Sequence, residues 1–246
     1  MTLLIDFLCR FGWGLAVGLV LTPSRLVPAG FFRINLLVVM GLATFAALLA
    51  ATAVPGAASW LAGVAAVVAW LGSVAWLAER DRPGMASCLA SGLLLAATVG
   101  VVTAADSAPG MAWRSFSALL SGLVVGLTVH AMLLGHWYLN APGMRIDALK
   151  RMIDWALAAW AARLVVAVLA AVPHVSQMAG ADRATLAILS LRWLAGLIGL
   201  PILLWMSRKT LDIPNTQSAT GILYVACLAA ITGELAGQLL GSMSAP

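Results

Sequence analysis

The residues best placed for chemistry are charged and polar side chains inside long apolar stretches. Glu234 is the only carboxylate in the last such stretch. It belongs to a polar series that advances by three, four, three, seven and four residues, namely Gln217, Thr220, Tyr224, Cys227, Glu234 and Gln238. On an α-helix these positions share an arc of about 100°. The spacing predicts a polar stripe, which serves either as interhelical hydrogen bonding or as a path for protons or quinol.

Four more charged residues, Asp6, Arg10, Arg163 and Arg192, also lie in apolar stretches. Counted at 1.5 Å per residue from the predicted helix ends, they and Glu234 fall in one layer of the membrane's outer half. Because an unpaired charge there is costly, we expect Glu234 to pair with Arg192 or Arg163. The layer is interpreted as structural ion pairing or as a proton path. Its excess of arginine would also suit an anionic ligand, such as a lipid phosphate, or a quinone oxygen.

A second group of candidates, His136, Trp137 and Tyr138, ends the fifth apolar stretch. Trp and Tyr are common anchors at membrane interfaces, but the adjacent histidine is less usual there. His136 shares one broad helix face with Ser121, Thr128 and Met132, so it is predicted to point into the bundle.

The last helix is predicted to start at the same side of the membrane, near Gln217, with Thr216 or Ser218 as its N-cap. A helix N-terminus attracts partial negative charge. We therefore predict a polar pocket, suited to a lipid headgroup or a quinone, formed by His136, Trp137, Tyr138 and Gln217.

Other chemistries have little support in the sequence. The three histidines are His130, His136 and His174, and they do not supply a histidine pair from two facing helices, so haem is not expected. No zinc-protease, phosphate-loop, nucleophile-elbow or dinucleotide-binding pattern occurs. We predict no metal site, no catalytic residue and no intrinsic cofactor, with quinone as a candidate ligand.

The composition indicates which elements position these residues. Of 246 residues 63% are hydrophobic and only 9% are charged, with a mean hydropathy of +1.02, whereas soluble domains average about 25% charged residues. Unbroken Ala, Leu and Val runs favour helices over the alternating strands of a barrel. The net charge of +5 comes mainly from short basic loops, so nucleic acid is not predicted as a partner. Cys9, Cys88 and Cys227 lie in apolar runs and are interpreted as packing residues.

We therefore predict an all-α, polytopic integral membrane bundle forming a single domain. A span needs about 20 apolar residues, and eight stretches qualify: 3–23, 32–53, 58–78, 85–104, 117–139, 152–172, 185–207 and 219–241. The first lacks the basic region and cleavage site of a signal peptide, so we expect a retained helix. The Gly/Ala-rich region 32–78 is interpreted as two full spans or as one re-entrant hairpin.

Orientation follows from the basic residues in the loops. The loops after spans 1, 3, 5 and 7 contain Arg25, Arg33, Arg80, Arg82, Arg145, Lys150, Arg151, Arg208 and Lys209. The loops after spans 2, 4 and 6 contain only Arg114 and Arg183. The first set is therefore predicted to be cytoplasmic and both termini non-cytoplasmic, in a multi-pass protein of a bacterial inner membrane.

The leading functional hypothesis is an integral membrane subunit of a bacterial respiratory or other energy-converting redox complex. Such a subunit would contact quinone, membrane lipids and other membrane and peripheral subunits, with no chemistry of its own. The first alternative is a small proton-coupled transporter that uses Glu234 and the buried arginines. The second is a membrane enzyme acting on a lipid-linked substrate, with His136 and Asp154 as acid and base.

Overall fold

The protein is a bundle of long helices. The computed structural model describes residues 1–54, 56–105, 110–141, 143–171, 182–213 and 215–243. These ranges contain helices and no strands, and eight helical stretches are long and apolar enough to cross a membrane, which confirms the predicted helical class. The elements are α1 Thr2–Leu21, α2 Ala29–Ala53, α3 Ala57–Leu77, α4 Asp81–Ala104, α5 Met111–Asn140, α6 Asp147–Ala171, α7 Arg183–Leu191, the π-helix η2 Arg192–Gly199, α8 Leu200–Thr210 and α9 Thr216–Met243.

Each predicted span falls mainly inside one helix, with α7, η2 and α8 forming one continuous stretch. The region 32–78 forms two separate helices, α2 and α3, with Gly56 at a positive φ of 115° where α3 begins. Several helices start earlier than predicted, and α4 already includes Asp81 and Pro83. Proline is tolerated there because the first helical turn has no intrahelical partner for its N–H groups.

Two helix starts have a side-chain cap. The Asp182 side chain accepts a hydrogen bond from the Thr185 backbone N–H at the start of α7. At the start of α9 the Asn215 side chain accepts from the Ser218 backbone N–H at 2.9 Å. The prediction that Thr216 or Ser218 caps this helix is therefore wrong, because Asn215 precedes both and reaches the free N–H first.

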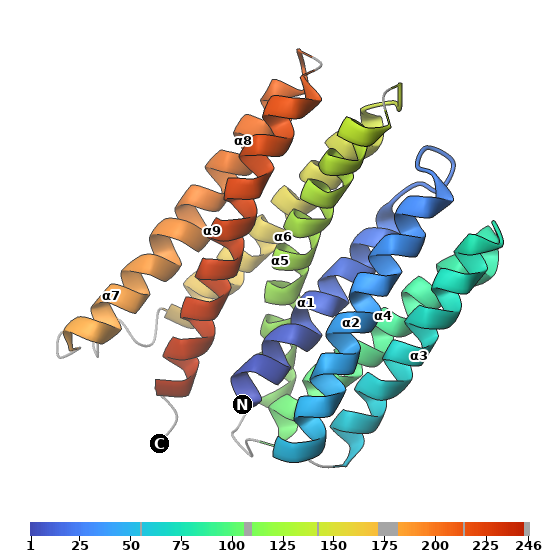
Figure 1. Cartoon of the computed structure of the whole chain (residues 1–246). Helices are drawn as coiled ribbons and strands as arrows, with labels where there is room; N and C mark the ends of the chain where they lie inside the picture. Colours follow the sequence, from blue (N-terminus) through green and yellow to red (C-terminus); the bar gives the residue numbers. More distant parts are fainter. Residues whose placement is uncertain (55, 106–109, 142, 172–181, 214, 244–246) are drawn as a thin grey trace.

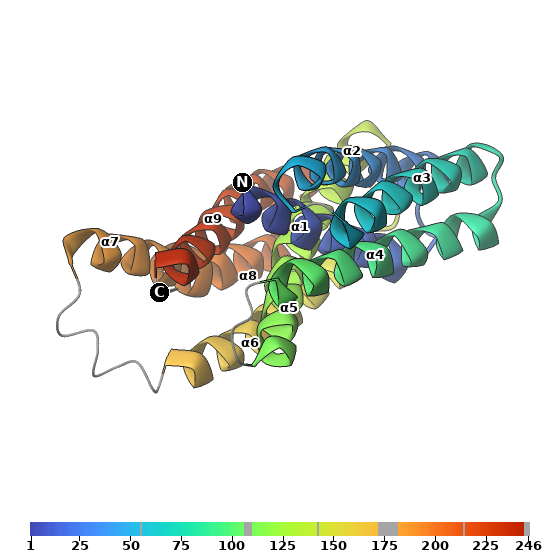
Figure 2. The same cartoon turned by 90° about the horizontal axis from the view of Figure 1, so that it is seen from below.

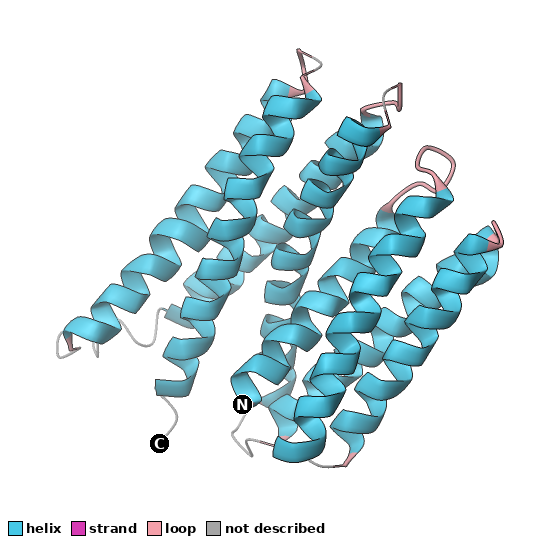
Figure 3. Ribbon diagram, in the orientation of Figure 1, coloured by secondary structure: helices cyan, strands magenta, loops and turns pink. Residues whose placement is uncertain are grey.

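The two chain termini lie at the same end of the bundle (Figure 1), which we call the terminal end. The opposite end holds the turns after α1, α3, α5 and α8. We call it the basic end, because the larger set of basic residues, from Arg25 to Lys209, lies in or beside these turns. Figure 3 shows that the described connections at both ends are short. A connection of this kind holds no folded unit outside the helices.

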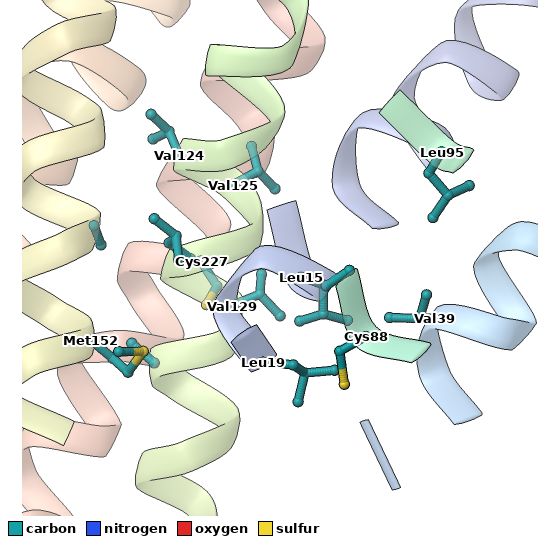
Figure 4. Close-up of a cluster of buried hydrophobic side chains, with 14 of the residues drawn as sticks. Leu15, Leu19, Val39, Cys88, Leu95, Val124, Val125, Val129, Met152 and Cys227 are labelled. Carbon is teal, nitrogen blue, oxygen red and sulfur yellow. The ribbon is translucent and has the colours of Figure 1, made fainter. Parts of the chain in front are cut away.

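Helix α5 lies at the centre of the bundle. It packs on α1, α6 and α9, while α1 also packs on α2 and α4. In its most apolar window 78% of the residues are buried, against 11% for the α7–η2–α8 stretch. Figure 4 shows part of the core around α5, with Val129 beside Leu15 and Leu19 of α1. The core therefore joins the first four helices to the rest.

The C-terminal end of α6 and the N-terminal end of α7 do not pack on each other. Helix α6 packs on α5 and α8, whereas α7 packs on α9. Figure 2 shows α7 standing apart from the final turns of α6 at the terminal end. The predicted layer of charged residues, described next, includes Arg163 of α6 and Arg192 of η2, the element that follows α7.

Candidate anion-binding site

A close crossing of α1 and α5 positions the first part of the site. Gly14 of α1 lies against Gly122 and Gly126 of α5, and a Cβ at any of the three would overlap the other helix's backbone. The Trp13 indole N–H also donates to the Leu119 carbonyl at 3.1 Å across this crossing. Small residues permit such backbone contact between membrane helices. The crossing places Arg10, one turn before Gly14, beside the face of α5 that carries Ser121.

Glu234 of α9 is the buried acceptor of the site. Arg10 donates to Glu234 Oε1 at 2.9 Å, and the two form a salt bridge between α1 and α9. Gln238 donates to the same oxygen at 3.2 Å, and Ser121 donates to Oε2. Glu234 is 9% exposed. These three donors leave both carboxylate oxygens of Glu234 hydrogen-bonded inside the bundle.

Arg10 also contacts a second carboxylate. Its guanidinium forms a salt bridge with Asp6, one turn earlier on α1. Glu234 was predicted to pair with Arg192 or Arg163, but its salt bridge is to Arg10, while its charge also acts on both of those arginines. The physical reason is the glycine crossing, which brings α1 closer to this part of α9 than the separated predicted spans suggested.

A second close crossing positions Arg192. Gly196 of η2 lies against Gly233 of α9, and a Cβ on Gly233 would meet the Gly196 Cα at 2.5 Å. The Arg192 side chain lies along α9 near Gly237, whose added Cβ would be 3.7 Å from Arg192 Nε. Arg192 is therefore held one turn from Glu234 on the same side of α9.

The π-helical turn has a local cause and a specific contact. Pro201 has no N–H, so it cannot donate to the Leu197 carbonyl four residues earlier. The Trp160 indole N–H of α6 donates to that carbonyl instead, at 3.2 Å. This bond links α6 to η2, the element that carries Arg192.

A small cavity joins these elements. It has a volume of about 40 Å³, enough for about three water molecules. Its polar lining consists of Ser121 of α5, Arg163 of α6, Arg192 of η2 and Glu234 of α9. Among the described residues neither Arg163 nor Arg192 forms a salt bridge. The cavity thus holds two half-buried arginines beside Glu234, whose charge acts on both of them, while Arg10 is shared between Glu234 and Asp6.

The site lies at a similar depth on all four helices that supply its charges. From the terminal ends of these helices, Arg10 and Arg163 are eight residues in, and Arg192 and Glu234 are nine. At 1.5 Å per residue this is a depth of about 12 to 14 Å. The structure therefore brings the five predicted charged residues, including Asp6, into one cluster.

The second predicted pocket is not assembled as expected. His136 is exposed and its Nδ1 lies 3.2 Å from the Tyr224 hydroxyl, itself 46% exposed. Trp137 stacks edge-on against Phe31 of α2, and the Tyr138 hydroxyl donates to the Arg145 carbonyl. Gln217 is exposed at the start of α9. The prediction that His136 points into the bundle is wrong, because its side chain is exposed and meets Tyr224 at the exposed margin of α9, whereas the neighbouring Gly135 packs against Thr220.

The polar stripe on α9 divides along its length. Thr220, Cys227, Glu234 and Gln238 are buried, and the Cys227 thiol lies 3.7 Å from the Thr128 carbonyl of α5. Gln217 and Tyr224 lie at the exposed margin of the stripe. The stripe thus packs on α5 and becomes charged only near the terminal end.

At the basic end, charged side chains form a separate network. Asp212 accepts from Lys150 and from Arg208, each at 3.2 Å, and Arg208 also donates to Asp154 at 2.9 Å. The hydrogen bond from Lys150 lowers the pKa of the Asp212 carboxyl below its usual value, aided by the nearby Lys209 and Arg208 charges. This network joins α6, α8 and the turn before α9 at the basic end of the bundle.

The buried histidine of α5 has a structural setting. His130 Nε2 lies 2.6 Å from the Thr22 hydroxyl, and its ring packs edge-on against Phe31. The described residues contain no group of three or more His, Cys, Asp or Glu side chains that could hold a metal ion. His174 lies outside the described residues.

Two residues of the site were not among the predicted charge-layer candidates. Ser121 and Gln238 both bond to Glu234. Gln238 was detectable because it follows Glu234 by four residues on the same stripe. Ser121 was not, because its role depends on which face of α5 meets α9. Comparison of the chain with protein family models, curated proteins and solved structures found no match.

Proposed function

We propose that this chain is a membrane-embedded binding subunit that holds the polar end of a lipid-soluble molecule at the cavity between α5, α6, η2 and α9. It has no chemistry of its own and leaves any reaction to partner subunits. The class of partner that we propose is a bacterial energy-converting redox complex of the inner membrane, with the terminal end of the bundle outside the cytoplasm.

The observation that carries this proposal is the charge of the cavity. Arg163 and Arg192 line it without a salt bridge among the described residues, while Glu234 is already bonded to Arg10. A guanidinium in an apolar medium is costly unless an acceptor compensates it. A ligand that brings an acceptor oxygen to these two arginines would supply that compensation.

The bonding of Glu234 makes the proton-coupled transporter a weaker alternative. Arg10, Ser121 and Gln238 all donate to this carboxylate. Protonation would weaken the salt bridge and turn one of these acceptor oxygens into a donor. A carboxylate held by three donors is better suited to orienting Arg10 than to exchanging a proton with a transported ligand.

The lipid-enzyme alternative is weaker because its acid and base are engaged elsewhere. His136 Nδ1 contacts Tyr224, and Asp154 is paired with Arg208 in the network at the basic end. The described connections are also too short to hold a soluble active site. A partner chain would have to supply one.

The test is gentle extraction from native membranes, with native mass spectrometry, an absorption spectrum and analysis of the co-purified lipid fraction. We expect the wild-type protein to retain a lipid-soluble ligand and partner subunits. The double variant Arg163→Gln/Arg192→Gln should lose the ligand, whereas the exposed control Arg183→Gln should keep it. A wild-type protein that purifies alone and without ligand would contradict the proposal.

A further inference from the structure

The charge and size of the cavity narrow the class of ligand, and this inference rests on the proposed binding function. Three arginines, Arg10, Arg163 and Arg192, face two carboxylates, Asp6 and Glu234. Counted by formal charge, three arginines against two carboxylates leave the cluster with one positive charge in excess. A ligand with one negative charge would balance it, whereas a neutral carbonyl oxygen would not.

The size of the cavity also argues against a neutral quinone as its occupant. Pockets that enclose a drug-sized ring are about 300 to 1,000 Å³, and this cavity is about 40 Å³. It admits a few ligand oxygen atoms in place of water, but not a quinone ring. The rest of any ligand must lie outside it.

The arginines select among singly charged groups. A guanidinium presents planar paired N–H donors that match the oxygens of phosphate and carboxylate. Two guanidinium groups from different helices, Arg163 of α6 and Arg192 of η2, approach the same space. A tetrahedral phosphate directs its oxygens along diverging directions, so it can bond to both arginines, whereas a planar carboxylate holds its two oxygens in one plane.

The surroundings offer a place for acyl chains. The elements that supply the two arginines carry exposed apolar side chains within two turns of them, Val165 and Leu169 on α6 and Leu194 and Ile198 on η2. A chain bound by its phosphate can thus extend along these apolar faces.

We propose that Arg163 and Arg192 bind a singly charged phosphate ester, with Glu234 and Arg10 fixing the charge of the cavity. The phosphate belongs to a membrane lipid or to a soluble phosphate compound, and the two sources share this chemistry. Both would occupy the cavity through the same oxygens.

The test is thermal unfolding of the intact protein in neutral detergent and phosphate-free buffer. The probes are dioleoyl phosphatidylglycerol, dioleoylglycerol, the soluble phosphodiester glycerophosphoglycerol and a short-chain quinone. The first two differ only in the headgroup phosphate and its glycerol, so their comparison on wild-type protein needs no variant. We expect phosphatidylglycerol to raise the melting temperature by about 5 °C at saturation and dioleoylglycerol to leave it unchanged.

Substitution of the cavity arginines tests whether the shift in melting temperature comes from binding in the cavity. Arg163→Gln and Arg192→Gln should each remove most of the shift, while Arg183→Gln should keep it. A shift with glycerophosphoglycerol that equals the lipid's supports the phosphate site and identifies a soluble source. An arginine-dependent shift with quinone alone overturns the phosphate inference and leaves the proposed function standing. If no probe shifts the wild-type protein, both are overturned.

Discussion

Glu234 and Arg10 connect the two ends of the chain inside the bundle, at a salt bridge of 2.9 Å. Removing one member of a buried pair leaves an uncompensated charge and typically costs about 3 to 5 kcal/mol. We therefore expect Glu234→Gln and Arg10→Gln each to lower the melting temperature in detergent by several degrees. The double variant should lose less than the sum of the two.

The matched control for this double-mutant cycle is Arg145→Gln. It breaks the exposed Arg145–Asp147 pair, where solvent screens the charges, so little change is expected. Additive losses in the Arg10/Glu234 cycle would show that the two residues do not stabilise each other.

At the residue scale, the sequence was sufficient to find the charged cluster but not its pairing. Charges in apolar runs are rare, and their depths follow from counting residues along a helix. The partner of Glu234 depends instead on which helices are neighbours, and Arg10 is 224 positions away in sequence. The exposure of the His136 side chain was not predicted for the same reason. Sharing a helix face with polar residues does not show which helix packs against that face.

At the scale of elements, the crossing of α1 and α5 depends on Gly122. A methyl group there would overlap the Arg10 carbonyl oxygen, which is backbone and cannot move aside. We expect Gly122→Ala to destabilise the protein by about 1 to 3 kcal/mol and to displace Arg10 from Glu234. Thermal unfolding in detergent measures the first effect.

Gly100→Ala is the matched control, because nothing lies within 4 Å of a Cβ at this position of α4. Alanine favours helix over glycine, so this variant should be as stable as wild type or slightly more so. Equal losses for Gly100→Ala and Gly122→Ala would contradict a specific role for the crossing.

The contact between Trp160 and the π-helix can be tested by a second cycle. Trp160→Phe removes the donor to the Leu197 carbonyl, which should cost about 1 to 3 kcal/mol because a buried acceptor loses its partner. In a Pro201→Ala background the restored N–H can donate to that carbonyl, so the same change should cost clearly less. If Trp160→Phe costs the same in both backgrounds, Pro201 is not the cause of the free acceptor.

The elements themselves were largely predictable, and their irregularities were not. Length and hydropathy indicated eight stretches, and each forms a helix. The start of α4 at Asp81 was not predicted, because a first turn with charged residues resembles a loop in composition. The π-helical turn was also missed, since Pro201 predicts a break but not how the helix adapts to it.

At the scale of the whole molecule, the structure places basic residues at the end opposite the termini. This is the distribution from which a non-cytoplasmic position of both termini is predicted, and that orientation stays a prediction. The central position of α5 could not be predicted from the sequence. Its mean hydropathy is close to that of its neighbours, although a much larger fraction of its residues is buried. Burial here depends on helix packing, which small residues such as Gly14 and Gly126 determine.

The central claim is that the cavity between Arg163 and Arg192 holds the anionic end of a bound molecule. The most direct measurement is a high-resolution cryo-EM map of the protein extracted from native membranes, with an antibody fragment added for size. The account predicts density that is not protein within hydrogen-bond distance of both guanidinium groups, next to an intact Arg10–Glu234 pair. A map in which either arginine is paired with a carboxylate of the chain, and the cavity contains water alone, would contradict it.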